Sequence, residues 1–474
     1  MWPSDEPEVK ILLDTLKKKG HEVAYWIGTR GDKKLCPQEA IFHDHFDAWD
    51  AKPAPALRQA PILPVSAELV SSMYETESSV LTLMNKRYDS SYVDERKHIY
   101  YTMLGYWNYV LDEVAPEAIV FNTIPHSIYS NIIYDLGQKR GIPMLCLEET
   151  WVARRMLSYS DYRKGSDELR AEIERVSKRV VTESELGEEL REYWKEHMQP
   201  QSRVAPVYMA PQREIGEGWG LVKHRVQIAL KALREGNLLS LVFGYMRRLG
   251  KKNLREDYES VIKRADWNVP FVYFPLHFQP ERTTSPQGGV YHDQHLVVET
   301  LSSALPDGWE IYVKEHPSQW WLRGKTRYSS VRYPGYYERL AKIPRVRLVP
   351  ISTDTFELTE RARAVAVITG TSGWEALLRG KRPLVFGIPW YRDCPDIFRV
   401  DSVETCAMAL EKIKNGARAP KENLLAFLKA FETVSIRAYL ENQLEEKPRY
   451  TAQENMQIMA SHTCEKLRTL KPRQ

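Results

Sequence analysis

A glycine- and hydroxyl-rich run, Thr369-Gly-Thr-Ser-Gly-Trp-Glu375, has the composition of a phosphate-binding turn. It follows an apolar run and precedes a helical pattern, so it joins a buried strand to a helix. Backbone N–H groups at such a turn point at a ligand, and the helix amino terminus favours an anion. We therefore expect Thr371, Ser372 and Gly373 to contact a phosphate or a nucleotide. The alternative is a helix cap, with Ser372 or Thr371 as N-cap and Glu375 completing a capping box.

A second polar group, Lys314-Glu-His-Pro317, follows another apolar run. Proline cannot continue a strand ladder, so Pro317 ends the strand and aims His316 outward. Lys314 and His316 are two residues apart and therefore share one side of the strand end. Two cationic donors beside a phosphate loop would neutralise a nucleotide leaving group.

Three carboxylates are candidates for chemistry at a sugar: Glu149, Glu281 and Asp293. Transfer through an oxocarbenium-like transition state needs a carboxylate near the anomeric carbon. Asp293 has the alternative of capping the helix that begins near His295, and Glu281 that of an ion pair with Arg282. His126, which follows a predicted strand, either faces the cleft between two domains or is a satisfied loop histidine.

The elements that position these groups begin with residues 269–317. A strand over 271–274, a polar loop with His277 and Gln279, a helix opened by Gln294, and a strand over 309–313 fit a right-handed βαβ unit. Ligands of open parallel sheets bind at the carboxyl ends of the strands, where both polar clusters fall. The sequence therefore predicts a binding site here.

Alternating strand and helix patterns predict an α/β fold of two Rossmann-like domains. In the first we expect helices over 8–19, 67–114 and 129–139, strands over 23–27, 118–121 and 143–147, and a loop over 28–65. A doubly wound domain normally opens on a strand, so we expect that the first strand is missing or that the start is misassigned. The expected divisions are 1–200, a linker and basic insertion over 201–264, 265–415, and C-terminal helices over 416–474 that cross back to the first domain.

The bulk composition is that of an ordinary globular protein. The chain has 474 residues, 43% of them hydrophobic and 27% charged, which exceeds one core. A net charge of +4 is too small to indicate nucleic acid. Five cysteines without a CxxC pair favour a reducing cytoplasm. We expect neither a signal peptide nor a membrane-spanning helix of about 18 apolar residues.

Residues 223–252 are the one conspicuously basic segment, with Lys and Arg alternating with apolar residues. As a basic amphipathic helix the segment would lie on an anionic membrane surface. The alternative is a solvated helical insertion whose apolar face packs on its own domain, and the sequence leaves both open.

The stretches FPLHFQPERTTSPQGGVYHDQ, KEHP and TGTSGWEALLRGKRPLVFG resemble bacterial glycosyltransferases of capsule and surface polysaccharide biosynthesis. The resemblance is to the retaining β-Kdo transferases that use CMP-Kdo and, more distantly, to bacterial sialyltransferases. It is strong over about 270–390. Over 1–265 only EETWVARR resembles the family, with Thr150 and Trp151 where the family has a glycine and an aromatic residue.

This resemblance implies a GT-B-like fold, in which two Rossmann-like domains face each other across a cleft, and a CMP-sugar donor with no cofactor and no metal. Asp293 would be the nucleophile and Glu149 the acid/base, with the acceptor near His126 and Arg154. Donor contacts would come from His277, Gln279, Glu281, Gln294, Lys314, His316, Pro317, Thr371, Ser372, Gly373 and Glu375. His316 would also be catalytic, and Glu375 would lie near the cytidine or its ribose.

Two other functions stay open. One is a GT-B enzyme that uses a UDP- or GDP-sugar, as a transferase or an epimerase. The epimerase is disfavoured because the basic insertion suits a lipid-linked acceptor. The other is a non-catalytic scaffold of a polysaccharide assembly complex. For the leading reading we expect a cell-surface polysaccharide or lipid-linked glycan as acceptor. We also expect a cytoplasmic protein that either stays free or binds the inner face of the membrane through 223–252.

Overall fold

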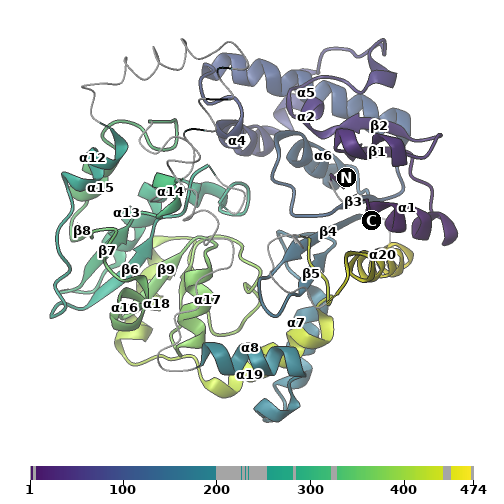
Figure 1. Ribbon diagram of the computed structural model, residues 1–474. Coiled ribbons are helices and arrows are strands. Elements are labelled where there is room, and N and C mark those ends of the chain that lie inside the picture. The colour runs from purple at the N-terminus through teal and green to yellow at the C-terminus, as the bar shows by residue number, and fades with distance from the viewer. Residues whose placement is uncertain are drawn as a thin grey trace.

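The computed structural model describes residues 2–3, 7–198, 226, 230, 233, 253–280, 284–321, 328–440 and 450–470. The predicted basic segment 223–252, apart from those three single positions, lies outside the described residues, and so does Glu281. The predicted α/β class is confirmed (Figure 1).

The carboxyl-terminal half is built on a six-stranded, fully parallel sheet. Its strands are β6 (Phe271–Pro275), β7 (Glu310–Lys314), β8 (Val346–Leu348), β9 (Ala364–Val367), β10 (Leu384–Val385) and β11 (Phe398–Arg399). They lie in the order β11-β10-β9-β6-β7-β8. This is the doubly wound order, and the chain reverses direction across the sheet between β6 and β9.

Apolar side chains fill both faces of this sheet, as a parallel sheet covered by helices requires. Val272 and Phe274 of β6 pack in one cluster with α13 (Gln294–Ala304), α15 (Tyr336–Lys342) and α18 (Val403–Lys414). Phe271 and Tyr273 pack in another with α16 (Thr355–Arg361), α17 (Thr371–Leu378) and α19 (Lys421–Val434). The alternation of period two divides the strand between the two cores. The remaining short helices of this half are α12 (Leu254–Glu259), η5 (Gly289–His292) and α14 (Ser318–Trp321).

The amino-terminal half carries two smaller sheets. β1 (Tyr25–Gly28) pairs in parallel with β2 (Ile41–Asp44), while β4 (Met144–Glu149) lies between β3 (Ile119–Phe121, parallel) and β5 (Met156–Tyr159, antiparallel). The helices of this half are α1 (Val9–Lys18), α2 (His45–Trp49), α3 (Ala67–Ser71), α4 (Tyr74–Leu83), α5 (Val93–Val114), α6 (Ile128–Lys139), α7 (Asp167–Val176) and α8 (Glu188–His197). Short 3₁₀ turns are η1 (Arg30–Leu35), η2 (Pro55–Leu57), η3 (Met84–Lys86) and η4 (Glu183–Glu185).

The prediction of a loop over 28–65 is wrong, because β2 lies within it. β2 has a fully buried histidine, His43, whose ring nitrogens bond the Tyr25 hydroxyl at 2.7 Å and the Lys52 carbonyl at 2.9 Å. A histidine whose ring nitrogens are hydrogen-bonded can be buried in the core. Such a polar residue interrupts the apolar pattern by which a short strand is predicted.

The first described residues lie between the two amino-terminal sheets. Trp2 donates its backbone N–H to the carbonyl of Ile27 in β1 at 3.1 Å. The carbonyl of Pro3 accepts from the Asn122 side chain, just after β3, at 3.3 Å. Residues 2–3 thereby link β1 to the end of β3 by hydrogen bonds.

The end of the chain returns to the amino-terminal half (Figure 1). α19 packs on α7, Ile436 forms an antiparallel bridge with Met156, and α20 (Ala452–Thr469) packs on α1 and β4. Val9 and Leu12 of α1 share one apolar cluster with Met456 and Met459 of α20.

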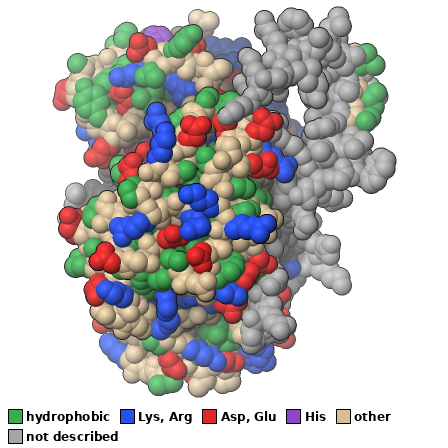
Figure 2. Space-filling model, turned by 90° about the vertical axis from the view of Figure 1, so that its left-hand side faces the viewer, with side chains coloured by type: hydrophobic (Ala, Val, Ile, Leu, Met, Phe, Trp, Pro, Cys, Tyr) green, Lys and Arg blue, Asp and Glu red, His purple; other side chains and the backbone are tan. Residues whose placement is uncertain are grey.

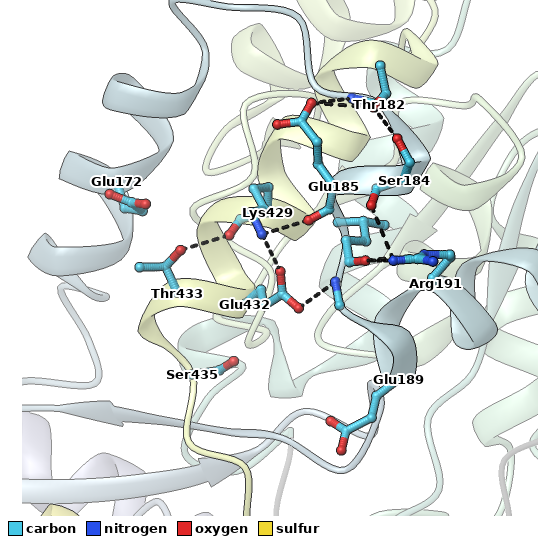
Figure 3. A network of polar contacts seen from close by, with 12 residues as sticks. Glu172, Thr182, Ser184, Glu185, Glu189, Arg191, Lys429, Glu432, Thr433 and Ser435 are labelled. Atoms are coloured by element: carbon cyan, nitrogen blue, oxygen red, sulfur yellow. Dashed lines mark hydrogen bonds and ion pairs between the residues drawn. The ribbon is translucent and has the colours of Figure 1, made fainter.

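Polar contacts fix α19 against the turn before α8 (Figure 3). Lys429 Nζ donates to the Glu185 carbonyl and to Glu432 Oε2, both at 2.7 Å. Glu432 Oε1 in turn accepts the N–H of Gly187 at 2.8 Å. The bonds from Lys429 to Glu185 and from Gly187 to Glu432 join residues 244 and 245 positions apart, so α19 belongs structurally to both halves.

Basic and acidic side chains are interspersed on the face of the molecule that Figure 2 shows. Within the described residues, no helix combines the length and apolar character that a membrane crossing requires.

Candidate active site

The reversal point between β6 and β9 brings two predicted groups together. His277 follows β6, and Thr369 and Gly370 follow β9. The Thr369 N–H donates to His277 Nε2 at 3.3 Å. A Cβ on Gly370 would lie only 3.1 Å from that nitrogen, so glycine lets the backbone approach the ring. Ligands of doubly wound sheets bind at this point.

His277 presents a neutral hydrogen-bond donor at this point. The side chain is buried, and desolvation, followed by the charges of His316 and Arg332, lowers its pKa to about 3. Because Nε2 accepts from Thr369, the proton of the neutral ring sits on Nδ1. Among the described residues no acceptor reaches Nδ1, and the buried hydroxyl of Thr369 likewise has no partner. The reversal point therefore holds two buried polar groups that lack a hydrogen-bond partner among the described residues.

Gln294 holds the backbone of His277 by two hydrogen bonds. Its Oε1 accepts the His277 N–H at 2.9 Å, and its Nε2 donates to the His277 carbonyl at 3.2 Å. The same carbonyl accepts from Arg332 at 3.0 Å. Gln294 thereby fixes the backbone of His277, and its contact with the donor stays a prediction.

A buried ion pair lies behind the two histidines. Glu315 accepts from Arg332 Nε at 2.7 Å, from the Tyr337 hydroxyl at 2.5 Å and from the backbone N–H of His316 at 2.7 Å. Both charged side chains are almost inaccessible to solvent, with exposures of 0% and 1%. Since Arg332 also holds the His277 carbonyl, one ion pair connects the ends of β6 and β7.

The prediction of two cationic donors at the end of β7 is wrong. Desolvation lowers the pKa of His316 to about 4, so the ring is neutral at pH 7. Its Nδ1 accepts the Ser318 N–H at 3.2 Å, which leaves the proton on Nε2. Lys314 donates to the Thr353 carbonyl at 2.6 Å and to Thr355 at 2.8 Å, before and at the start of α16. Burial lowers its pKa to about 8.

The capping-box interpretation of the 369–375 run is also wrong. α17 begins at Thr371, its N-cap is Gly370, and no side chain caps it. Thr371 and Ser372 therefore lie in the first turn, where backbone N–H groups lack helical partners and favour an anion. Gly373 serves packing, because a Cβ there would lie 2.7 Å from Val367 Cγ2 and collide with the Tyr391 hydroxyl.

Glu375 lies on the inner side of α17. It is half-buried, and desolvation raises its pKa to about 7, with a partly opposing effect of Arg379. Besides desolvation, the charge of Glu375 raises the pKa of the hydroxyls of Tyr193, Tyr273 and Tyr391, so this carboxyl group lies among tyrosines. At neutral pH this carboxyl group is able to donate or accept a hydrogen bond.

The amino-terminal half meets the reversal point through the loop after β6. Gln287 Nε2 donates to Glu148 Oε1, at the end of β4, at 2.7 Å and to the Ile388 carbonyl at 2.9 Å. Lys86 donates to the carbonyls of His126 at 3.0 Å and Ser285 at 3.3 Å. The carboxyl ends of the strands of both halves therefore face each other, which is the GT-B-like arrangement.

Several predicted residues have other contacts. Asp293 caps α13 by accepting the His295 N–H at 3.0 Å, and its side chain is 55% exposed. The hydrogen bond from His295 lowers its pKa. Glu149 accepts the Leu440 N–H at 2.5 Å, on the crossing segment. Gln279 contacts Thr284 and Gln319.

Arg154 lies in the turn 150–155, which links β4 to β5. Trp151, Ala153 and Arg154 have φ angles of +59°, +46° and +55°, in the left-handed region that non-glycine residues seldom occupy. Pro317 follows His316 directly and precedes α14. The roles assigned to all these residues stay predictions.

Four residues of the site were not predicted: Glu148, Gln287, Glu315 and Arg332. Glu148 and Glu315 stand beside predicted residues, and the alternation of strand faces is the signal that could have separated them. For the described residues, no group of three or more His, Cys, Asp or Glu side chains could hold a metal ion.

Comparisons with known proteins point to one family for part of the chain. Residues 246–395 match the family described as capsule polysaccharide biosynthesis protein. The capsule polysaccharide modification protein LipA of Neisseria meningitidis serogroup B (strain ATCC BAA-335 / MC58) is 37% identical over 96 residues, 20% of this chain. The match spans only 12% of the length of that relative.

Two solved structures are similar at low identity. KpsC of Thermosulfurimonas dismutans, titled a beta Kdo 2,4 transferase, is 13% identical, with coverage of 73% of this chain and 87% of that chain and a TM-score of 0.31. The UDP-GlcNAc 2-epimerase of Methanocaldococcus jannaschii is 13% identical, with coverage of 89% and 93% and a TM-score of 0.26. Over residues 246–395, which contain the reversal point and both histidines, the chain matches the family of capsule polysaccharide biosynthesis proteins, and the resemblance seen in its sequence is confirmed.

Proposed function

We propose that this protein is a glycosyltransferase. It would move an acidic sugar, Kdo or a similar one, from a CMP-activated donor to a cell-surface polysaccharide or lipid-linked glycan. The observation that carries the proposal is the meeting of His277 with the 369–373 turn at the reversal point between β6 and β9. The family match over the same residues and the resemblance of its motifs to CMP-Kdo transferases support the sugar donor.

The hydrogen-bond donors at the reversal point suit a phosphate group that gains negative charge. His277 Nδ1–H and His316 Nε2–H are uncharged, and the first turn of α17 has no side-chain cap. When the bond between the sugar and the phosphate of CMP breaks, negative charge grows on that phosphate. Preorganised neutral donors and a helix terminus stabilise this charge without reorganising solvent. Glu375, among its tyrosines, is the expected partner of the ribose or base.

Thermal stabilisation by nucleotides tests this proposal. CMP, UDP, GDP and cytidine are compared at about 100 times their dissociation constants, where a ligand adds roughly 2.7 kcal/mol of stability. We expect a shift with CMP and a much smaller one with cytidine, because cytidine lacks the phosphate. A shift with UDP or GDP instead of CMP would leave a different nucleotide-sugar enzyme. No shift with any of them would favour the scaffold.

The acceptor, metal independence and a location at the inner face of the membrane stay predictions. The last depends on residues 223–252, and extraction from membranes by salt is its test, because salt screens surface electrostatics.

A further inference from the structure

An aromatic surface lies where β2 passes into α2. The ring of His45 lies edge-on to those of Phe46, Trp49 and Tyr129, with centroids 5.2, 5.3 and 5.6 Å away. Its Nδ1 is hydrogen-bonded to the Tyr129 hydroxyl, on α6, at 2.5 Å. His45 and Trp49 are half-buried, whereas Phe46 is 52% exposed. These four residues form what we call the aromatic platform, and Phe46 presents its ring to the solvent.

A buried carboxylate beside the aromatic platform has one oxygen without a hydrogen bond. Asp44 is 6% exposed, and its Oδ1 caps α2 by accepting the N–H groups of Phe46 and Asp47, both at 3.1 Å. Among the described residues no donor is hydrogen-bonded to Oδ2, and no acceptor to the indole N–H of Trp49. Arg30 Nε lies 3.5 Å from Oδ2, but its side chain is 77% exposed. An ion pair with so exposed a cation is weak, so a ligand hydroxyl is able to bind Oδ2 at little cost.

The charges around the aromatic platform balance one another. Three carboxylates with side chains 8–25% exposed are paired with three cations 47–77% exposed, namely Asp44, Asp47 and Asp50 with Arg30, Lys52 and Arg87. Sugar hydroxyls donate to carboxylates and accept from cations, and the C–H face of a pyranose packs on the face of an aromatic ring. An anionic membrane surface would be repelled by the same carboxylates. The chemistry of the platform thus suits a sugar better than a lipid surface.

The aromatic platform adjoins the region where the two halves meet. The Tyr88 hydroxyl donates to the Trp49 carbonyl at 3.1 Å. Two residues before Tyr88, Lys86 donates to the Ser285 carbonyl at 3.3 Å. Ser285 belongs to the segment after β6, in which His277 also lies. The platform is therefore joined through η3 to the segment that carries part of the proposed phosphate site, but it shares no residue with that site.

We propose that the aromatic platform binds a sugar residue of the acceptor glycan, apart from the place where the donor phosphate binds. The inference rests on the proposed function for the identity of that glycan. The Phe46 ring packs on the C–H face of the pyranose, and Asp44 Oδ2 accepts a hydrogen bond from one of its hydroxyls. Arg30 moves aside and donates to a neighbouring sugar oxygen. The platform thereby holds the glycan while another of its residues reaches the reaction centre.

Saturation-transfer NMR on the full chain tests the inference. The probes are the methyl glycosides of Kdo, galactose and N-acetylglucosamine, which are an acidic, a neutral and an amide-bearing pyranose. We expect at least one of them to bind, with or without CMP, because the two sites share no residue. Phe46→Ala should weaken this binding at least about threefold, the scale of one aromatic contact. Tyr74→Ala is the matched control, since it removes a ring that is 60% exposed at the start of α4, and it should bind as wild type does.

Asp44→Asn is the second variant. Asparagine caps a helix as well as aspartate does, so the amide oxygen keeps the cap and its NH₂ group takes the place of Oδ2. The hydrogen bond to a charged oxygen is then lost, and sugar binding should weaken at least about tenfold.

The inference would be overturned if none of the glycosides binds, if either variant binds as tightly as wild type, or if CMP displaces the bound sugar. Co-sedimentation with phosphatidylglycerol vesicles that depends on Phe46, in a protein that binds no sugar, would overturn it too and make the platform a membrane contact. If CMP still stabilises the protein in these cases, the proposed function stands. Sugar bound to the platform of a protein that no nucleotide stabilises would leave the platform standing and overturn the proposed function.

Discussion

The buried pair of Glu315 and Arg332 provides a quantitative test of how the site is held. Replacing Arg332 by Met removes the guanidinium and leaves the Glu315 carboxylate buried, with its side chain 0% exposed. Removing one partner of such a pair costs about 3–5 kcal/mol. The change also removes the 3.0 Å bond to the His277 carbonyl, so CMP binding should weaken as well.

Arg347→Met is the matched control. Arg347 pairs with Glu310 at 2.8 Å on the same sheet, nearly the separation in the buried pair, but the side chains are 23% and 26% exposed. A pair open to solvent contributes about 0–1 kcal/mol. The double variant Glu315→Gln/Arg332→Met should recover part of the loss, because it leaves no unpaired charge in the core.

Hydrogen exchange of peptides covering β6 and β7, together with urea unfolding, measures these free energies. An Arg332→Met variant that destabilises these strands by no more than Arg347→Met does would contradict the role of the buried pair. A double variant less stable than Arg332→Met alone would contradict it as well.

Three further predictions concern the same region. The folded-state pKa of His316, about 4, is below its usual 6.5, so as pH falls from 6.5 to 4 the unfolded chain takes up a proton that the folded chain does not. Stability should therefore decrease over this window, by up to about 3 kcal/mol at 1.36 kcal/mol per pKa unit. Urea unfolding at pH 7 and 4.5 should show a smaller decrease for His316→Gln, and an equal decrease would contradict the assignment. Ser372→Asp should stabilise α17 by about 0.3–1 kcal/mol through the helix dipole yet weaken CMP binding at least about tenfold. Ser372→Ala keeps the backbone N–H groups of the turn and adds no charge, so it should weaken CMP binding far less; unchanged CMP affinity in Ser372→Asp would exclude this turn as the phosphate site. Gly373→Ala should lose about 1–3 kcal/mol in thermal unfolding by overpacking, and Tyr391→Phe in the same chain should restore part of it.

The strongest hydrophobic patterns in the sequence predicted the elements that carry the site. β6, α13, β7 and β9 were all expected within a few residues, because their strands are apolar throughout and read as buried. β5 was not expected, since a four-residue antiparallel strand after a turn with three left-handed residues has no distinctive periodicity. α17 was expected to begin later, because serine and threonine are preferred N-caps. The actual N-cap is Gly370, whose backbone lies against the imidazole ring of His277.

The partners within the site could not be predicted from local sequence. Gln287 and Glu148 are 139 positions apart, and Arg332 and Glu315 are 17 apart with a helix between them. Which glutamate of the Glu148-Glu149 pair faces the other half depends on the register of β4 against β5, with Glu148 opposite Leu157 and Glu149 opposite Met156. That register is set by packing and not by residue type.

The packing of α20 on α1 has a consequence for the order in which the protein matures on the ribosome. About 430 residues separate the end of α1 from the start of α20. At a synthesis rate of about 5–20 residues per second, α1 waits about 20–90 s before its helical partner is made. During that time Val9, Leu12 and Leu16 lack Met456 and Met459 as neighbours. α1 is thus translated long before the helix that covers its apolar face, and a nascent-chain chaperone would find its binding surface there.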